Sequence, residues 1–378
     1  MRKVAVFFGG KSCENEISVL TGIFVMNVLR CERYQLFPVY IHTNGLMYTS
    51  PKMTSVDIFR DKKYAQFQRI LIEGGTMYAL NESKGRIKPL FTPDVAINCC
   101  HGGLEEGGGI SALCRQNHIP LASPDLAPSA VFMDKCMTKV VMRGLDVPTV
   151  DYIRVNEEDY QKRGAFLLKR IANRLKYPVI VKPAHLGSSI GISLASNEEE
   201  VKQAIDTAFA LDNRILIEKY LPNKQDINCA AYSLNGEIFV SEAEMAFGAG
   251  VYSFEEKYIK RTADGVASKG QNSTKDGGRY LLSGELREKI RAYTKTIYKR
   301  MNLAGAVRMD YLVSDGKAYL CEVNTVPGSL AYYLFCERMT DARTFFGDLM
   351  EDALRKQQSD EKKILTTGIL NGVVGRNK

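Results

Sequence analysis

The stretch AVRMDYLVSDGKAYLCEVN, residues 306–324, has the pattern of two antiparallel strands joined by a tight turn. Both halves are rich in Val, Leu and Tyr, which favour strands, and the sequence Ser-Asp-Gly-Lys at 314–317 separates them as a turn signal. We therefore predict a hairpin with an odd-numbered loop centred on Gly316. In this register Asp310 and Glu322, which are 12 positions apart, lie directly opposite each other on one face.

The polar residues of this hairpin share that face. Arg308 lies two positions before Asp310 on the first strand, and Asn324 lies two positions after Glu322 on the return strand. Two carboxylates and an amide oxygen are hard ligands that suit Mg²⁺ carried with the phosphates of a nucleotide. The alternative is a solvated hairpin face with incidental charges. Because the return strand is otherwise apolar and a Pro-Gly break follows it, we favour the metal site.

A second group of residues suits a phosphate. Lys182 ends an apolar strand, and the Gly-Ser-Ser turn at 187–189 offers backbone N–H groups and hydroxyls to an anion. Lys135 and Lys257 are two more candidates for phosphate charge, although each alone is more typical of a surface lysine. The apolar strand at 215–221 ends in a polar pair, as an adenine slot between two sheets would require. Taken singly, none of these features identifies a ligand.

The first part of the chain alternates strands and helices. We expect strands at 4–8, 36–41 and 95–100, the second at a sheet edge because it contains Pro38. Glycines follow the first and third strands, a pattern that implies a parallel sheet whose functional edge lies at the strand carboxyl ends. The remaining expected elements are helices at 14–29, 130–143, 197–211, 283–301 and 340–357 and strands at 179–182, 190–194, 215–220, 227–233 and 238–242. Residues 46–93 and the tail 361–378 carry no pattern that we can place.

Composition excludes several classes of protein. The 378 residues, 45% of them hydrophobic and 25% charged, are typical of a soluble globular protein with two or three domains. The 51 Lys and Arg and the 43 Asp and Glu are scattered, so we expect no nucleic-acid partner. No apolar stretch reaches the roughly 20 residues that cross a bilayer, and the N-terminal apolar run is too short for a signal peptide, so we expect a cytoplasmic protein without a membrane partner. Nine cysteines without a C-x-x-C pair predict reduced, mostly buried thiols.

The order of several motifs resembles the D-alanine–D-alanine ligase family of ATP-grasp enzymes. From about residue 3 to about residue 350 the chain carries Gly-Gly-x-Ser-x-Glu-x-Glu (9–16), His-Gly (101–102), Met-Asp-Lys (133–135), Lys-Pro…Gly-Ser-Ser-x-Gly (182–191), Glu-Lys-Tyr (218–220 and 256–258), Arg-Met-Asp (308–310) and Glu-Val-Asn-Thr-Val-Pro-Gly (322–328). So many motifs in one order make the resemblance specific.

This resemblance implies the fold class α/β plus α+β with an ATP-grasp architecture. An N-terminal α/β domain with a parallel sheet (1–130) would precede two α+β subdomains that clasp ATP (131–226 and 227–360) and a tail (361–378). The implied activity joins two D-alanine molecules through an acylphosphate, giving ADP and phosphate, for the synthesis of peptidoglycan precursors. Two Mg²⁺ ions, with Mn²⁺ as an alternative, small-molecule amino acid substrates and a homodimer are also implied.

The resemblance assigns roles to individual residues. On the nucleotide side they are Lys135 and Lys182 at the α- and β-phosphates, Ser188 and Ser189 in the loop that covers them, Glu218, Lys219 and Leu221 at the adenine, Asp226 at the ribose and Lys257 at the γ-phosphate. The metal ligands are Asp310, Glu322 and Asn324. The catalytic group comprises Arg308 and the Gly328 N–H at the oxyanion and the triad of Glu14, Ser188 and Tyr258, which anchors the amino group and the lid. The amino-acid substrates would be contacted by His101, Tyr333 and Leu334.

Three segments depart from the family pattern, all on the amino-acid side. Residues 104–110 lack the usual Gln, residues 329–334 lack the Thr- and Ser-rich pattern, and the lid at 259–280 lacks its Pro-Ala exit. Two alternatives therefore remain open: a ligase for another pair, such as D-alanine with D-serine, and an ATP-binding regulator without catalysis. Arg308 and the metal residues favour an enzyme, and Tyr258 favours an amine as the nucleophile. We expect the Gly- and Lys-rich lid to be mobile until nucleotide binds.

Overall fold

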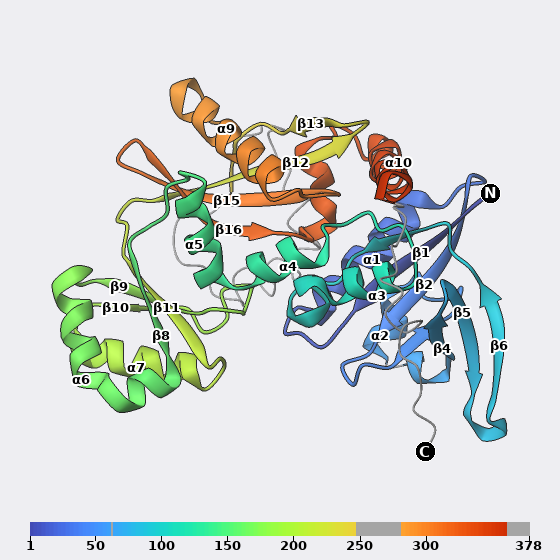
Figure 1. Ribbon diagram of the computed structural model, residues 1–378, viewed down its shortest axis with the longest axis horizontal. Coiled ribbons are helices and arrows are strands. Elements are labelled where there is room, and N and C mark those ends of the chain that lie inside the picture. Colours follow the sequence, from blue (N-terminus) through green and yellow to red (C-terminus); the bar gives the residue numbers. More distant parts are fainter. Residues whose placement is uncertain (62, 247–280, 361–378) are drawn as a thin grey trace, which may run out of the picture.

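The computed structural model describes residues 1–61, 63–246 and 281–360. These residues form three sheets, each with helices packed against it (Figure 1). One sheet contains parallel strands and the other two are antiparallel, which confirms the predicted α/β plus α+β class. In the described part of the chain no helix is both long enough and apolar enough to cross a membrane.

The N-terminal sheet has seven strands in the order β6-β5-β4-β3-β2-β1-β7. They are β1 (Arg2–Gly9), β2 (Tyr34–Ile41), β3 (Met47–Thr49), β4 (Gln68–Glu73), β5 (Thr76–Asn81), β6 (Arg86–Phe91) and β7 (Val95–Asn98). The parallel core of β2, β1 and β7 was predicted, and the antiparallel arm β3–β6 is built from the segment that sequence could not place. The expectation that Pro38 marks an edge strand is wrong, because β2 lies between β1 and β3. Since β3 pairs with Tyr40 and Ile41, the missing N–H of Pro38 falls outside that ladder.

Helices cover both faces of this sheet. They are α1 (Asn15–Leu29), α2 (Val56–Arg60), α3 (Ile110–Gln116) and the C-terminal α10 (Ala342–Asp360). Alternate residues of β1 point to opposite faces. Phe8 belongs to a core cluster with Phe346 of α10, whereas Phe7 belongs to a second cluster with Ile110 and Cys114 of α3. The C-terminal helix therefore returns to the N-terminal sheet, as Figure 1 shows.

The central sheet is antiparallel, with the order β10-β9-β11-β8. Its elements are β8 (Tyr152–Asn156), α6 (Glu157–Arg174), β9 (Val179–Pro183), β10 (Ser193–Ala195), α7 (Glu198–Phe209) and β11 (Arg214–Lys219), preceded by α4 (Leu126–Met133) and α5 (Lys135–Gly144). Val181 and Ile217 point toward α6 and α7 and join their core cluster. Lys182 and Glu218, one position along each strand, therefore point to the opposite face.

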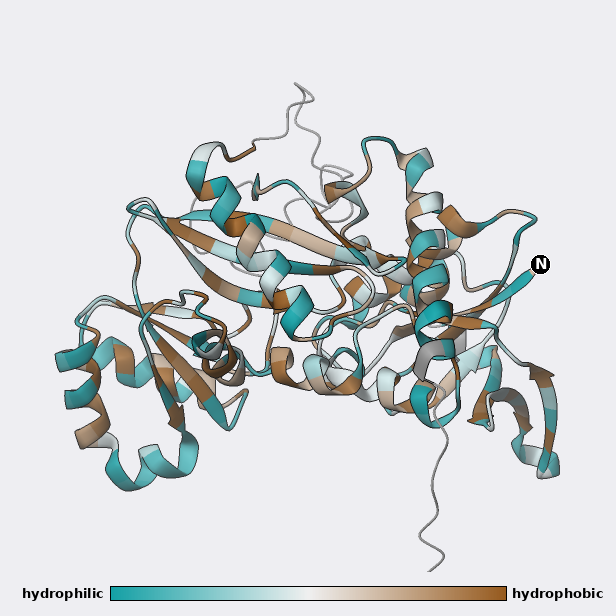
Figure 2. Cartoon of the chain, turned by 45° about the horizontal axis from the view of Figure 1, so that its top comes forward, coloured by the Kyte–Doolittle hydropathy of each residue, from teal (hydrophilic) through white to brown (hydrophobic). Residues whose placement is uncertain are grey.

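The C-terminal sheet has the order β13-β12-β15-β16, with β14 paired to β12. Its elements are β12 (Gln225–Leu234), β13 (Glu237–Val240), β14 (Glu244–Met245), α9 (Gly284–Arg300), β15 (Val307–Ser314) and β16 (Lys317–Asn324). Ile290 and Ile297 of α9 pack on Tyr311 and Leu320 of the predicted hairpin. Figure 2 shows hydrophobic residues along the strands of this sheet and hydrophilic residues on the outer turns of the helices.

Candidate active site

The β15–β16 hairpin brings Asp310 and Glu322 opposite each other, as predicted, but by a different route. The predicted odd-numbered loop is wrong: Ser314 pairs with Lys317, which leaves a two-residue turn, Asp315-Gly316. Both turn residues have positive φ (49° and 70°), as a tight hairpin with the right twist requires. The register then shifts after Asp310, so that Cys321 is an extra residue in β16 and Glu322 faces Asp310.

Arg308 is a buried cation within this polar face. Its Nε and Nη2 donate to the two carboxylate oxygens of Asp310 at 2.6 and 2.8 Å, and its Nη1 donates to the Tyr333 hydroxyl at 3.2 Å. Asn324 donates through Nδ2 to Asp310 at 3.1 Å. Burial disfavours the charged guanidinium, but Asp310 and Tyr333 together outweigh this effect and hold the pKa of Arg308 well above its usual range. The structure therefore brings the four predicted polar residues of the hairpin together.

The donor chemistry of this face fits Mg²⁺. Across the described residues, no group of three or more His, Cys, Asp and Glu side chains is placed to hold a metal by itself. A Mg²⁺ ion at Asp310 and Glu322 would therefore take the Asn324 amide oxygen and the phosphate oxygens of a nucleotide as further ligands, which are the hard oxygens that it prefers.

A lysine–glutamate cluster lies on the open face of the central sheet. Glu218 is 3% exposed and forms ion pairs with both Lys182 and Lys139. The Lys139 Nζ lies 2.5 Å from Glu218 Oε1. Burial acts to raise the pKa of Glu218, but the two lysines lower it to about 2. Lys182 also donates to the Cys321 sulfur at 3.8 Å, so the central sheet meets the hairpin at the predicted phosphate lysine.

Sequence reasoning missed Lys139. It lies four residues after Lys135 on α5 and so falls on the same side of that helix. The residue is only 2% exposed, and besides its ion pair with Glu218 it donates to the Val150 carbonyl oxygen at 3.1 Å. The signal available in the sequence was a Lys135–Lys139 pair at helical spacing, which is also common on solvated helices.

The Gly-Ser-Ser loop lies between the predicted phosphate lysines and the N-terminal sheet. Lys135 Nζ donates to the Leu186 carbonyl oxygen at 2.5 Å, just before the loop. Ser188 donates to a carboxylate oxygen of Glu14, so two members of the predicted triad are in contact. Ser188 and Ser189 both adopt left-handed backbone angles (φ 52° and 61°), which turn the loop sharply.

His101 and Glu106 connect the N-terminal sheet to the segment after the hairpin. His101 Nε2 lies 2.8 Å from Thr21 Oγ1. Glu106, which sequence reasoning did not select, accepts the backbone N–H of Gly102 at 2.7 Å and that of Val326 at 3.1 Å. Burial and the charge of Glu14 raise the pKa of Glu106 to about 7. It therefore joins the His-Gly motif directly to the Asn-Thr-Val-Pro-Gly motif.

The other predicted residues lie around this centre or outside the described chain. Lys219 ends β11 and is exposed, and Leu221 follows it in a half-buried position. Asp226 at the start of β12 pairs with Lys224 at 2.6 Å. Lys257, Tyr258 and the lid at 259–280 fall outside the described residues.

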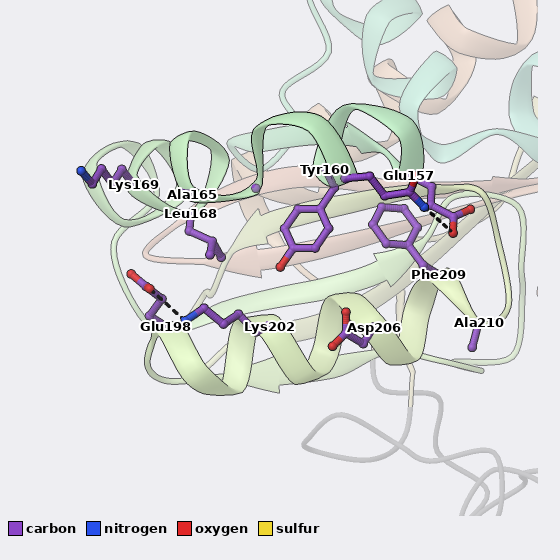
Figure 3. A pocket seen from close by; sticks show the side chains of 12 residues that line it. Glu157, Tyr160, Ala165, Leu168, Lys169, Glu198, Lys202, Asp206, Phe209 and Ala210 are labelled. Carbon is purple, nitrogen blue, oxygen red and sulfur yellow. Dashed lines mark hydrogen bonds and ion pairs between the residues drawn. The ribbon is translucent and has the colours of Figure 1, made fainter.

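A groove of about 780 Å³ lies between α6 and α7, on the helix-covered side of the central sheet (Figure 3). Tyr160, Leu168 and Phe209 form part of its lining, and Lys202 and Glu198, which form an ion pair of 3.2 Å along α7, line one end. None of the predicted site residues lines this groove. The sheet separates it from Lys182 and Glu218.

The family profile described as "D-ala D-ala ligase N-terminus" matches residues 3–124, and "D-ala D-ala ligase C-terminus" matches residues 141–355. The chain belongs to the D-alanine–D-alanine ligase family. A curated D-alanine–D-alanine ligase from Caldicellulosiruptor bescii is 31% identical over 96% of this chain and 97% of its own length. The crystal structure of the ligase from Helicobacter pylori is 25% identical with a TM-score of 0.73, over 96% of this chain and 100% of that one. The structure from Bacillus anthracis, complexed with ATP, is 19% identical with a TM-score of 0.63, over 95% and 100% of the two chains, and shows the shared fold.

In this member of the D-alanine–D-alanine ligase family a left-handed turn follows Gly328. Ser329, Leu330 and Ala331 have φ between 51° and 54° and are all buried. Three consecutive non-glycine residues in this conformation are strained and persist only because their surroundings fix them. The turn carries Tyr333 to its contact with Arg308 and buries Leu334 beside Ala331.

Proposed function

We propose that this chain joins two D-alanine molecules at the expense of ATP, as an ATP-dependent carbon–nitrogen ligase that supplies peptidoglycan precursors. The observation that carries the proposal is the polar face of the hairpin, where Asp310 and Glu322 oppose each other beside the buried Arg308. Lys182 contacts this hairpin from the central sheet through Cys321. A nucleotide between the two sheets would therefore meet lysines on one side and metal-binding oxygens on the other.

The proposed chemistry begins by activating a carboxylate, which is a poor electrophile. Transfer of the γ-phosphoryl group of ATP to the first D-alanine would give an acylphosphate and ADP. Lys135, Lys182 and, from outside the described residues, Lys257 would bind the phosphates, and Asp310, Glu322 and Asn324 would hold two Mg²⁺ ions. When bound, these ions spread the charge of the transferring phosphoryl group.

The second step forms the amide. The amine of the second D-alanine would attack the acylphosphate, and Arg308 with the Gly328 N–H would stabilise the tetrahedral oxyanion before phosphate leaves. Glu14 would hold the amino group of the first substrate, and Ser188, which already contacts Glu14, would link it to the loop over the phosphates. His101, Tyr333 and Leu334 would line the amino-acid side.

Substrate-dependent phosphate release tests this function. The purified chain is incubated with Mg-ATP and with D- or L-amino acids, singly and in pairs, and phosphate and dipeptide are measured. D-Alanine alone should release phosphate and give D-alanyl-D-alanine, while L-alanine should not. Mixed dipeptides formed in preference to D-alanyl-D-alanine, or ATP binding without turnover, would contradict the proposal and favour the other ligase or the regulator.

We further propose a cytoplasmic homodimer with domain boundaries near residues 130 and 226. Light scattering after size-exclusion chromatography measures the mass of the assembly. A mass near twice the 42.2 kDa of the chain is expected, and a mass near 42.2 kDa would exclude the dimer.

A further inference from the structure

His185 lies between the end of β9 and the loop 186–191, with a carboxylate on each side of its ring. Its Nδ1 lies 2.9 Å from Asp212 Oδ1, and its Nε2 lies 3.5 Å from Asp134 Oδ2. Its backbone N–H donates to Asp212 Oδ2 at 2.8 Å. Because both ring nitrogens face carboxylates, the arrangement favours the imidazolium, in which both nitrogens are donors.

The two carboxylates are themselves fixed by the elements that they begin. Asp134 caps α5 and accepts the backbone N–H groups of Cys136 and Met137 at 2.7 and 3.1 Å. Asp212 accepts the backbone N–H of Arg214 at 3.2 Å, where β11 begins. Four charged groups lie around His185: Asp134 and Lys135 of α5, and Asp212 and Arg214 beside β11. A further cation, Arg154 of β8, acts on the neighbouring Cys136. His185 thus joins two elements through opposite charges.

The segment that His185 anchors leads directly into the phosphate loop. The Ala184 carbonyl oxygen accepts the Lys135 N–H at 3.0 Å, and the Leu186 carbonyl oxygen accepts Lys135 Nζ at 2.5 Å. At the tip of the loop, Ser188 donates a hydrogen bond to Glu14. The loop is therefore attached to the N-terminal sheet at its tip and to α5 and β11 at its base.

We propose that His185 is a positioning residue for ATP, which holds the base of the loop 186–191 and the first turn of α5 together so that Lys135 and the loop N–H groups are arranged for the phosphates before the nucleotide arrives. This inference rests on the proposed function, which assigns Lys135 and this loop to the phosphates. A preformed site binds more tightly because less ordering remains for the ligand to impose.

The charge of His185 between Asp134 and Asp212 sets the pH range over which this residue holds the loop. Hydrogen bonds to Asp134 and Asp212 raise the pKa of His185 to about 9. The imidazolium therefore persists at neutral pH and is lost as the pH rises through about 9. ATP affinity should therefore fall as the pH rises through about 9. A variant without an ionisable side chain at position 185 should not show this fall.

The test measures Mg-ATP binding by calorimetry and steady-state kinetics of the full chain between pH 6.5 and 10. His185→Asn should weaken Mg-ATP binding and raise the KM for ATP by about tenfold, the order of effect expected for losing a charge-assisted hydrogen bond. The kcat and the KM for the amino acid should stay within about twofold. His185→Arg retains a cation with several donors and should recover most of the affinity. His118→Asn, at an exposed position after α3, is the matched control and should behave as the parent.

Asp212→Asn gives a second variant in case His185→Asn does not fold. It keeps an oxygen for one of the two backbone N–H groups that Asp212 accepts and removes the charge that faces His185, so the same selective rise in the KM for ATP is expected. Equal Mg-ATP binding by His185→Asn and His118→Asn would overturn the inference, as would a common loss of ATP affinity, amino-acid affinity and kcat. A parent protein that binds no Mg-ATP would instead overturn the proposed function on which the inference rests.

Discussion

Lys139 Nζ lies 2.5 Å from Glu218 Oε1 in the interior of the molecule, where both side chains are almost completely buried. Lys182 pairs with the other carboxylate oxygen of Glu218. Two lysines therefore share the Glu218 carboxylate, and the Glu322 carboxylate of the hairpin acts on Lys182 as a further negative charge. Removing one member of such a buried, paired group leaves a charge without its partner, which costs free energy of unfolding.

Replacing Lys139 with Met tests this arrangement. The variant leaves Glu218 buried with one of its two ion pairs, so the free energy of unfolding should fall by about 3 kcal/mol, as is typical when one partner of a buried pair is removed. Urea unfolding followed by circular dichroism measures the change. Lys202→Met is the control, because Lys202 pairs with Glu198 on an exposed helix face, where the loss should stay below about 1 kcal/mol. Equal losses in the two variants would contradict the structural importance of the buried pair.

Glu322→Gln should nearly abolish turnover while the protein remains folded. An amide offers one neutral oxygen where the proposed metal site needs a full carboxylate charge. We expect kcat to fall on the order of 10²-fold or more, with an unchanged thermal midpoint, and chelation of divalent ions should inactivate the parent. Glu237→Gln, on the exposed side of β13, is the control. Activity of Glu322→Gln within a few-fold of that control would remove Glu322 from the metal site.

Local sequence patterns predicted much of the fold. They failed for elements whose structure depends on packing against distant segments. Alternating strands and helices were correctly located in the N-terminal core, but α6 and β8 were missed. Helix α6 is highly charged, and only Leu167, Leu168 and Ile171 of it are buried, so its apolar stripe is short. Its acidic first turn after Asn156 was the available signal. The arm of β3 to β6 is held by strand pairing, which no short stretch of sequence encodes.

The hairpin shows the same limit at the site. The Asp315-Gly316 pair signals a two-residue turn, and with that turn alone Asp310 would face Cys321 instead of Glu322. The bulge at Cys321 places Asp310 opposite Glu322, as we predicted from an odd-numbered loop. No residue type in the sequence indicates this bulge. Lys139 and Glu106 escaped selection for a related reason, since their roles depend on burial and on partners from distant segments.

Arg308→Lys should be a poor replacement although it preserves the charge. The planar guanidinium reaches both oxygens of Asp310 and the Tyr333 hydroxyl at once, whereas an ammonium acts as a point charge with a shorter reach. We expect kcat to fall on the order of 10²-fold, as for the loss of an oxyanion donor. Steady-state dipeptide formation provides the measurement, and Arg300→Lys, at the exposed end of α9, should have no effect. An unchanged kcat in Arg308→Lys would move the oxyanion role to another group.

Glu106 should make the stability of the protein depend on pH between about 4.5 and 7. Burial and the neighbouring Glu14 raise the pKa of Glu106 to about 7, above its ordinary value of 4.5. The folded state therefore holds this proton more tightly than the unfolded state does. The stabilisation is present at and below about pH 4.5 and is lost as the pH rises to about 7.

Glu106→Gln, which does not titrate, isolates this contribution. Between pH 5 and pH 7.5 the free energy of unfolding of the parent should fall by about 1–3 kcal/mol relative to that of the variant, since one unit of pKa displacement corresponds to about 1.4 kcal/mol. Urea midpoints measured at intervals across this range provide the test, with Glu32→Gln at an exposed position as the control. Gln keeps only one carbonyl oxygen for the N–H groups of Gly102 and Val326, so the substitution also adds a pH-independent difference in the free energy of unfolding. The fall of the parent's free energy of unfolding relative to that of the variant with rising pH reports the Glu106 proton, and parallel curves would show that Glu106 ionises in the folded protein at its ordinary pKa.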